Sequence, residues 1–192
     1  MKLLVRILSH IVFIYAPISL QPLYASHNLD TSRSHKTYFI AKGFIGVKEE
    51  GNNSGYWVSR FLKSCGLKPG AQWCAAFVNF CLDSAGGKRP PFTGSGLARH
   101  FATRNKTIKA TEVISKNMEL PAGTIIVWRR GTTPFGHAGI VEKWKGRKGD
   151  TIEGNTSSGV RGSQHDGDGV WRRKREINPT SHFRITDFIL VK

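Results

Sequence analysis

Apolar residues recur with the spacing of helices in the first half of the chain and with the spacing of strands in the second. The most apolar segment is 73–85, which reads WCAAFVNFCLDSA. A helix that is apolar on most sides lies inside a fold, so this segment predicts a central buried helix. Shorter patterns predict further helices at 37–47, 56–62 and 97–102.

Beyond residue 120, runs of β-branched and aromatic residues alternate with glycine-containing turns, which is typical of strands. Because the helices come first and the strands then follow through short turns, we predict an α+β fold, with N-terminal helices packed on a C-terminal antiparallel sheet. Residues 88–120 are polar and irregular apart from the short helix. The five predicted strands are 124–128, 139–144, 150–153, 170–173 and 185–191.

The N-terminus has the layout of a secretory signal peptide. A basic lead precedes a largely apolar run at 7–20, and the small residue Ala25 provides a cleavage site. The run is too short and too interrupted for a membrane span of about 20 residues. We therefore expect an exported protein, periplasmic or extracellular, with this division: a signal peptide at 1–25, a flexible lead at 26–36 and one domain at 37–192.

The formal net charge is +16, which favours a polyanionic partner such as nucleic acid, anionic lipid or an acidic wall polymer. Export, and the lack of any nucleic-acid-binding motif, argue against nucleic acid. We expect electrostatic contact with the anionic envelope surface instead, and we interpret the basic run 172–175 as a solvated edge of the sheet. The chain has no CxxC pair and only scattered His residues, so neither a metal nor another cofactor is predicted.

We expect the protein to be a monomer. In a monomer, three cysteines leave at least one thiol unpaired. Cys74 begins the buried helix, where backbone N–H groups and the helix dipole favour a thiolate. Cys81 lies two turns deeper on the same helix face and suits apolar packing, and Cys65 precedes a loop. Whether Cys65 and Cys81 form a disulfide stays open.

An imidazole and an orienting group follow in the second half of the chain. His137 stands at the start of a strand between Gly136 and Gly139, and Glu153 and Asn155 stand at the end of the next. Adjacent antiparallel strands place the end of one beside the start of the other, so either residue could accept a hydrogen bond from the imidazole. We favour Glu153. A thiol, an imidazole and an orienting group together predict a cysteine hydrolase.

These segments resemble the CHAP group within the NlpC/P60-type, papain-like hydrolases. The likeness lies in WCAAFVNFCLDSAG, GHAGIV and EGN, with His137, Glu153 and Asn155 placed 63, 79 and 81 residues after Cys74. Residues 50–70 and 153–175 also resemble a branch of exported CHAP proteins common in Bacteroidetes-like bacteria. The resemblance extends over about 37–192 and implies a papain-like fold that cleaves peptidoglycan.

The resemblance also implies a role for each matching residue. Cys74 would be the nucleophile, His137 the general base, Glu153 the orienting carboxylate and Asn155 a fourth polar group. The oxyanion hole would use the backbone N–H of Cys74, with the Gln72 side chain as a candidate second donor. The candidate substrate contacts are Gln72, Trp73 and Phe135.

The family implies either of two amide bonds: the bond between muramic acid and L-alanine, or one within the peptide stem or cross-bridge. The sequence does not choose, because specificity depends on cleft loops such as 88–120. One alternative is a secreted antibacterial effector with the same chemistry, although a secretion signal favours remodelling of the cell's own wall. Another is a non-catalytic wall-binding module, which the presence of nucleophile, base and orienter disfavours.

Overall fold

The computed structural model describes residues 31–158 and 167–192. Within them, one antiparallel sheet runs in the order β1-β7-β3-β4-β5-β6, and β2 pairs with β4. The predicted signal peptide lies outside the described residues. The strands are β1 (Ile108–Lys109), β2 (Glu119–Leu120), β3 (Ile125–Arg130), β4 (Gly136–Lys145), β5 (Lys148–Thr156), β6 (Gly169–Glu176) and β7 (Phe183–Ile189).

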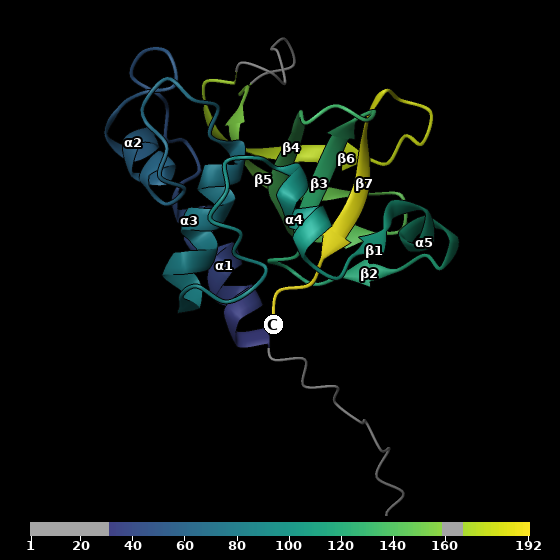
Figure 1. Ribbon diagram of the computed structural model, residues 1–192. Coiled ribbons are helices and arrows are strands. Elements are labelled where there is room, and N and C mark those ends of the chain that lie inside the picture. The colour runs from purple at the N-terminus through teal and green to yellow at the C-terminus, as the bar shows by residue number, and fades with distance from the viewer. Residues whose placement is uncertain (1–30, 159–166) are drawn as a thin grey trace, which may run out of the picture.

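The helices gather mainly beside one part of the sheet (Figure 1). α3 packs on α1, α2, β4 and β5, and α4 lies over β3 and β7. This arrangement confirms the predicted α+β fold of N-terminal helices against an antiparallel sheet. The helices are α1 (Thr31–Gly43), α2 (Tyr56–Lys63), α3 (Cys74–Gly86), α4 (Arg99–Arg104) and α5 (Ala110–Ser115).

Two apolar clusters cover the two faces of the sheet. Val127, Ala138 and Ile140 join α1–α3 in one cluster, whereas Ile126 and Trp128 belong to the other. Successive side chains of a strand point to opposite faces, and residues paired across strands point to the same face. Since His137 pairs with Trp128, its side chain projects from the face of the second cluster.

The first helix begins earlier than predicted, so the expected flexible lead at 26–36 is wrong for residues 31–36. Arg33 is only 6% exposed, and its guanidinium donates to the carbonyl oxygens of Pro90, Gly87 and Arg89 at 2.9–3.0 Å. These carbonyls follow α3, so the hydrogen bonds of Arg33 link α1 to the loop beyond α3. The folded region therefore includes residues that read as polar and solvated in the sequence.

Segment 88–120 is more ordered than its polarity indicates, because it contributes α4, α5 and two short edge strands. β4 starts at Gly136 rather than 139, which places His137 within the strand. Among the described residues, no helix combines the length and apolarity that crossing a membrane requires.

Candidate active site

Cys74 is the first residue of α3 and is 7% exposed. The preceding residue, Trp73, is fully buried and anchors this end of the helix. Its ring stacks on Phe61 at 5.7 Å between centroids, and its indole N–H donates to Glu49 at 3.3 Å. The first N–H groups of a helix have no carbonyl partner within the helix, so the thiol lies where a negative charge is stabilised.

His137 lies in β4 and faces Glu153 of β5. Its Nε2 is 2.9 Å from Glu153 Oε2, and the two side chains are only 3% and 0% exposed. An ionised carboxylate only accepts, so Nε2 carries the proton and donates it to Glu153. Nδ1 is then the nitrogen left for the Cys74 thiol, with which the imidazole also interacts.

The glycines that flank His137 allow close contacts. A Cβ on Gly139 would lie 2.7 Å from Glu153 Cγ, and one on Gly136 would lie 2.4 Å from the carbonyl oxygen of Trp128. Gly139 therefore leaves the space that the Glu153 side chain occupies, and Gly136 lets β4 start tightly against β3. The GHAG segment thus supplies the imidazole together with the room for its partner.

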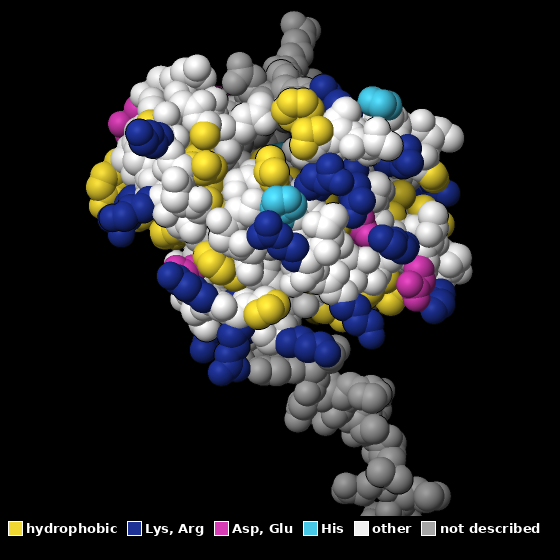
Figure 2. All heavy atoms as spheres, in the orientation of Figure 1, with side chains coloured by type: hydrophobic (Ala, Val, Ile, Leu, Met, Phe, Trp, Pro, Cys, Tyr) yellow, Lys and Arg dark blue, Asp and Glu magenta, His cyan; other side chains and the backbone are white. Residues whose placement is uncertain are grey.

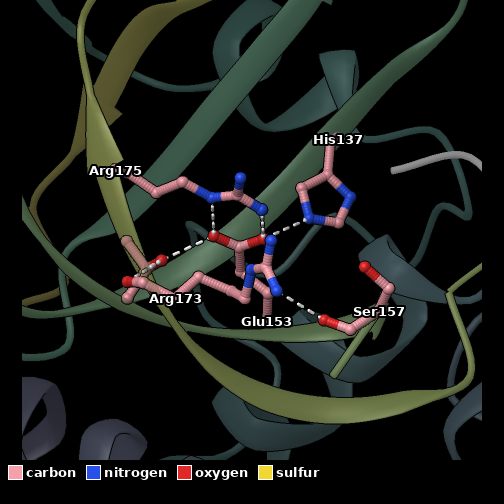
Figure 3. Close-up of polar contacts among 6 residues, drawn as sticks. His137, Glu153, Ser157, Arg173 and Arg175 are labelled. Carbon is pink, nitrogen blue, oxygen red and sulfur yellow. Dashed lines mark hydrogen bonds and ion pairs between the residues drawn. The ribbon is translucent and has the colours of Figure 1, made fainter. Parts of the chain in front are cut away.

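The Glu153 carboxylate accepts four hydrogen bonds from three residues, two on each oxygen. Oε1 accepts from the Thr151 hydroxyl at 2.5 Å and from Arg175 Nε at 2.7 Å. Oε2 accepts from His137 and from Arg175 Nη2. Figure 3 shows the carboxylate held between Arg175 and the imidazole. A carboxylate has about four acceptor positions, so the acceptor capacity of this buried group is filled.

The charges in this cluster shift three pKa values. Burial opposes ionisation of Cys74, but the hydrogen bond and charge of His137, with the N–H groups of Ala138 and Ala75, lower the pKa of the thiol overall. Burial would also lower the pKa of His137, yet Cys74 and Glu153 raise it to about 9. Although burial alone would raise the pKa of Glu153, Arg175 and His137 hold it well below its usual range. Each shift favours the charged form of its group: the thiolate, the imidazolium and the carboxylate.

Asn155 does not contact the imidazole. Its Oδ1 accepts from the backbone N–H of Trp73 at 3.4 Å, and its Nδ2 donates to Asn53 at 3.0 Å and to the carbonyl oxygen of Gly167 at 3.1 Å. Its φ of 53° is in the left-handed region. The alternative in which Asn155 orients His137 is therefore wrong in this structure, because Asn155 instead joins β5 to the residue before Cys74.

Loss of the Asn155 hydrogen bonds should destabilise the fold without changing the charge state of the Cys74 thiol. We expect Asn155→Ala to lower the free energy of unfolding by about 2–3 kcal/mol, through lost buried hydrogen bonds and the left-handed backbone. Asn155→Gly loses the same bonds but tolerates that backbone, so it should cost about 1 kcal/mol less. Denaturant unfolding measures both values. If Asn155→Ala raised the pKa of Cys74 as far as removal of His137 does, Asn155 would after all orient the imidazole.

The predicted substrate contacts differ in exposure. Trp73 is fully buried, so its prediction as a substrate contact is wrong; it is a core residue at the helix start. Phe135 is 57% exposed, two residues before His137, and Gln72 is exposed just before the helix. Leu97 is also 44% exposed, and the sequence did not single it out. Its neighbour Ala98 lies close to Gly136, the residue before His137.

The two other cysteines are free thiols, so the structure contains no Cys65–Cys81 disulfide. Cys81 is fully buried, and burial raises its pKa well above the ordinary value. Cys65 accepts from Asn79 Nδ2 at 3.3 Å. Across 31–158 and 167–192, no group of three or more His, Cys, Asp or Glu side chains is placed to hold a metal ion.

Sequence reasoning missed Thr151 and Arg175 as partners of Glu153. The run 172–175 was expected to be a solvated edge, but only Arg172 and Lys174 are exposed, while Arg173 and Arg175 are half-buried. The expectation is wrong for these two because alternate residues of a strand face opposite sides. That alternation is the signal that could have identified Arg175.

An N-terminal buried helix that starts at a cysteine, packed on an antiparallel sheet that presents a histidine and a carboxylate, defines the papain-like class of fold. Residues 66–155 match the family model of the CHAP domain. The CHAP family is in the NlpC/P60-like cysteine hydrolase group, and the matched segment includes Cys74, His137, Glu153 and Asn155. Comparisons with curated proteins and with solved structures gave no match.

Proposed function

We propose that this protein hydrolyses an amide bond of peptidoglycan, as an N-acetylmuramoyl-L-alanine amidase or as a stem or cross-bridge endopeptidase. CHAP domains are generally cysteine- and histidine-dependent amidases or peptidases, and this family suggests peptidoglycan as substrate. The observation that carries the proposal is the connected set of Cys74, His137 and Glu153 within that domain. A thiol of lowered pKa beside an oriented imidazole can attack a carbonyl carbon.

In the proposed reaction, the Cys74 thiolate adds to the amide carbonyl and a tetrahedral oxyanion forms. The Cys74 backbone N–H, at the start of α3, is the donor that we assign to this oxyanion, and Gln72 remains the candidate second donor. The imidazolium of His137 then gives its Nδ1 proton to the leaving amine as the C–N bond breaks. Water, deprotonated by the neutral imidazole, hydrolyses the thioester, and the sulfur leaves as the thiolate beside the restored imidazolium.

This scheme requires a protonated imidazole and an ionised thiol at the same time. The pKa of Cys74 is lowered and that of His137 is raised to about 9, so the required pair prevails between the two values. We expect the rate of muropeptide release to fall above about pH 9, where His137 loses the proton that the leaving amine needs. A rate that stays constant to pH 10.5 would contradict His137 as the proton donor.

We further propose that the protein acts outside the cytoplasm, where peptidoglycan lies. The signal-peptide layout of residues 1–25 supports export. Figure 2 shows Lys and Arg side chains over much of one face, with few Asp or Glu among them, and the net charge is +16. Such a surface is attracted to acidic wall polymers and lipid headgroups, and this attraction weakens as salt rises.

Digestion of purified peptidoglycan, followed by mass spectrometry of the soluble products, tests the proposed function and identifies the bond. Loss of peptide from the muramic-acid lactoyl group would indicate an amidase, and a shortened stem or opened cross-link would indicate an endopeptidase. Absence of new termini, with Cys74 still reactive towards a thiol probe, would favour the alternative of a wall-binding module.

A further inference from the structure

Arg175 makes the most extensive contact with the Glu153 carboxylate. Its Nε donates to Oε1 at 2.7 Å and its Nη2 to Oε2 at 2.5 Å, a parallel two-bond pairing. The arginine side chain is 12% exposed, and its Cζ lies 5.5 Å from the centroid of the Trp128 ring. Both the ion pair and the ring stacking hold the guanidinium in one orientation.

The same oxygen of Glu153 serves both Arg175 and His137. Oε2 accepts from Arg175 Nη2 and from His137 Nε2. The guanidinium fixes the plane of the carboxylate, and this plane sets the direction in which the imidazole N–H donates. The Trp128 ring lies 5.2 Å from the His137 ring and thus contacts both partners. Arg175, Glu153, His137 and Cys74 form a continuous chain of contacts from β6 to the start of α3.

We propose that Arg175 is a positioning residue of the active site, which fixes the Glu153 carboxylate in the orientation that His137 requires. The proposal rests on the proposed function of Cys74 and His137 and extends it by one residue. Arg175 lies 20 residues beyond the CHAP match, which ends at 155. β6 positions it, because this strand pairs with β5 along the register Thr151↔Arg173 and Gly149↔Arg175.

Arg175 also contributes charge to a cluster from which water is nearly excluded. The titratable groups that face one another here are Cys74 of α3, His137 of β4, Glu153 of β5, and Arg173 and Arg175 of β6, with Cys65 near Cys74. Without the Arg175 guanidinium, a buried carboxylate would lose its main cationic partner. Loss of the guanidinium would also make the whole cluster more negative, so we expect thiolate formation to require a higher pH.

The test is the pH dependence of Cys74 alkylation by iodoacetamide, measured on the full chain with Cys65→Ser and Cys81→Ala as background. We expect Arg175→Met to raise the apparent pKa of alkylation by about one unit and to slow muropeptide release about tenfold or more. Arg175→Lys keeps the charge but cannot form the two parallel bonds. It should leave that pKa within about 0.3 units of the parent value while release is still slowed.

Arg172→Met is the matched control, because Arg172 also pairs with a glutamate through two bonds, on the same strand but at the surface. Arg172→Met should change neither the apparent pKa of Cys74 alkylation nor the rate of muropeptide release. An unchanged alkylation pKa in folded Arg175→Met, or an equal shift in Arg172→Met, would overturn the proposal. If Arg175→Met does not fold, parent-level release by Arg175→Lys would overturn it. Alkylation needs no peptidoglycan, so the proposal can be tested even if the protein does not cleave the wall.

Discussion

Cys74→Ala should abolish release of muropeptides from purified peptidoglycan, with a loss on the order of 10⁴-fold or more. Among the described residues, Cys74 is the nucleophile that the proposed reaction uses, because the imidazole and the helix terminus both act on its sulfur. The substitution removes one sulfur atom from a site that is 7% exposed, so the fold should persist. Circular dichroism and the unfolding midpoint verify that the loss is chemical.

Cys81→Ala is the control for this prediction, since it removes a thiol from the same helix two turns deeper. Cys81 is fully buried and lies in the apolar cluster around α3. Its replacement should retain most of the release rate and lower the free energy of unfolding by about 1 kcal/mol, as the loss of a small buried side chain does. Equal losses of activity in the two variants would show that perturbing α3, rather than removing the nucleophile, stops the reaction.

His137→Ala should remove activity on the order of 10³-fold or more, through two separate losses. The leaving amine loses its proton donor, and the thiol loses the partner that offsets its burial. Burial is the largest influence on Cys74 and acts against ionisation. The pKa of the thiol should therefore rise above its ordinary value of about 8.5, and alkylation at pH 7 should slow by about tenfold or more.

An exposed histidine provides the comparison for His137→Ala. His35 lies in α1, far along the chain from the cluster, and its side chain packs edge-on against Phe39. His35→Ala should match the parent protein in alkylation rate and in muropeptide release. If His137→Ala kept the parent's alkylation rate at pH 7, the thiol would be activated by something other than this imidazole.

Local signals in the sequence were sufficient to predict that Cys74, His137 and Glu153 lie together. The apolar run of α3 indicates a buried helix whatever surrounds it, and adjacent antiparallel strands bring His137 to Glu153. The early start of α1 was not predictable, because Arg33 is a polar residue buried by carbonyls from a distant loop. The prediction of Trp73 as a substrate contact was wrong because the exposure of a side chain near a helix start depends on its tertiary neighbours. For Trp73 these neighbours include Phe61 and Glu49.

The positions of Asn155 and Arg175 depend on tertiary contacts that no short segment of sequence contains. Asn155 follows Glu153 by two residues, yet its left-handed backbone turns it towards Trp73 and away from His137. Arg175 belongs to a basic run whose composition indicates a solvated surface. Only the pairing of β6 with β5 shows that Arg175 reaches a buried carboxylate.

The central claim is that His137 holds Cys74 as a thiolate at neutral pH. The alkylation rate of Cys74, measured from pH 4 to 10 in the parent protein and in His137→Ala, tests this claim most directly. In the parent, the account predicts a rate that reaches its plateau at a pH below the ordinary thiol pKa of about 8.5, because the pKa of the Cys74 thiol is lowered. In His137→Ala, the rate should still be rising above pH 8.5. Superimposable profiles for the two proteins would contradict the claim.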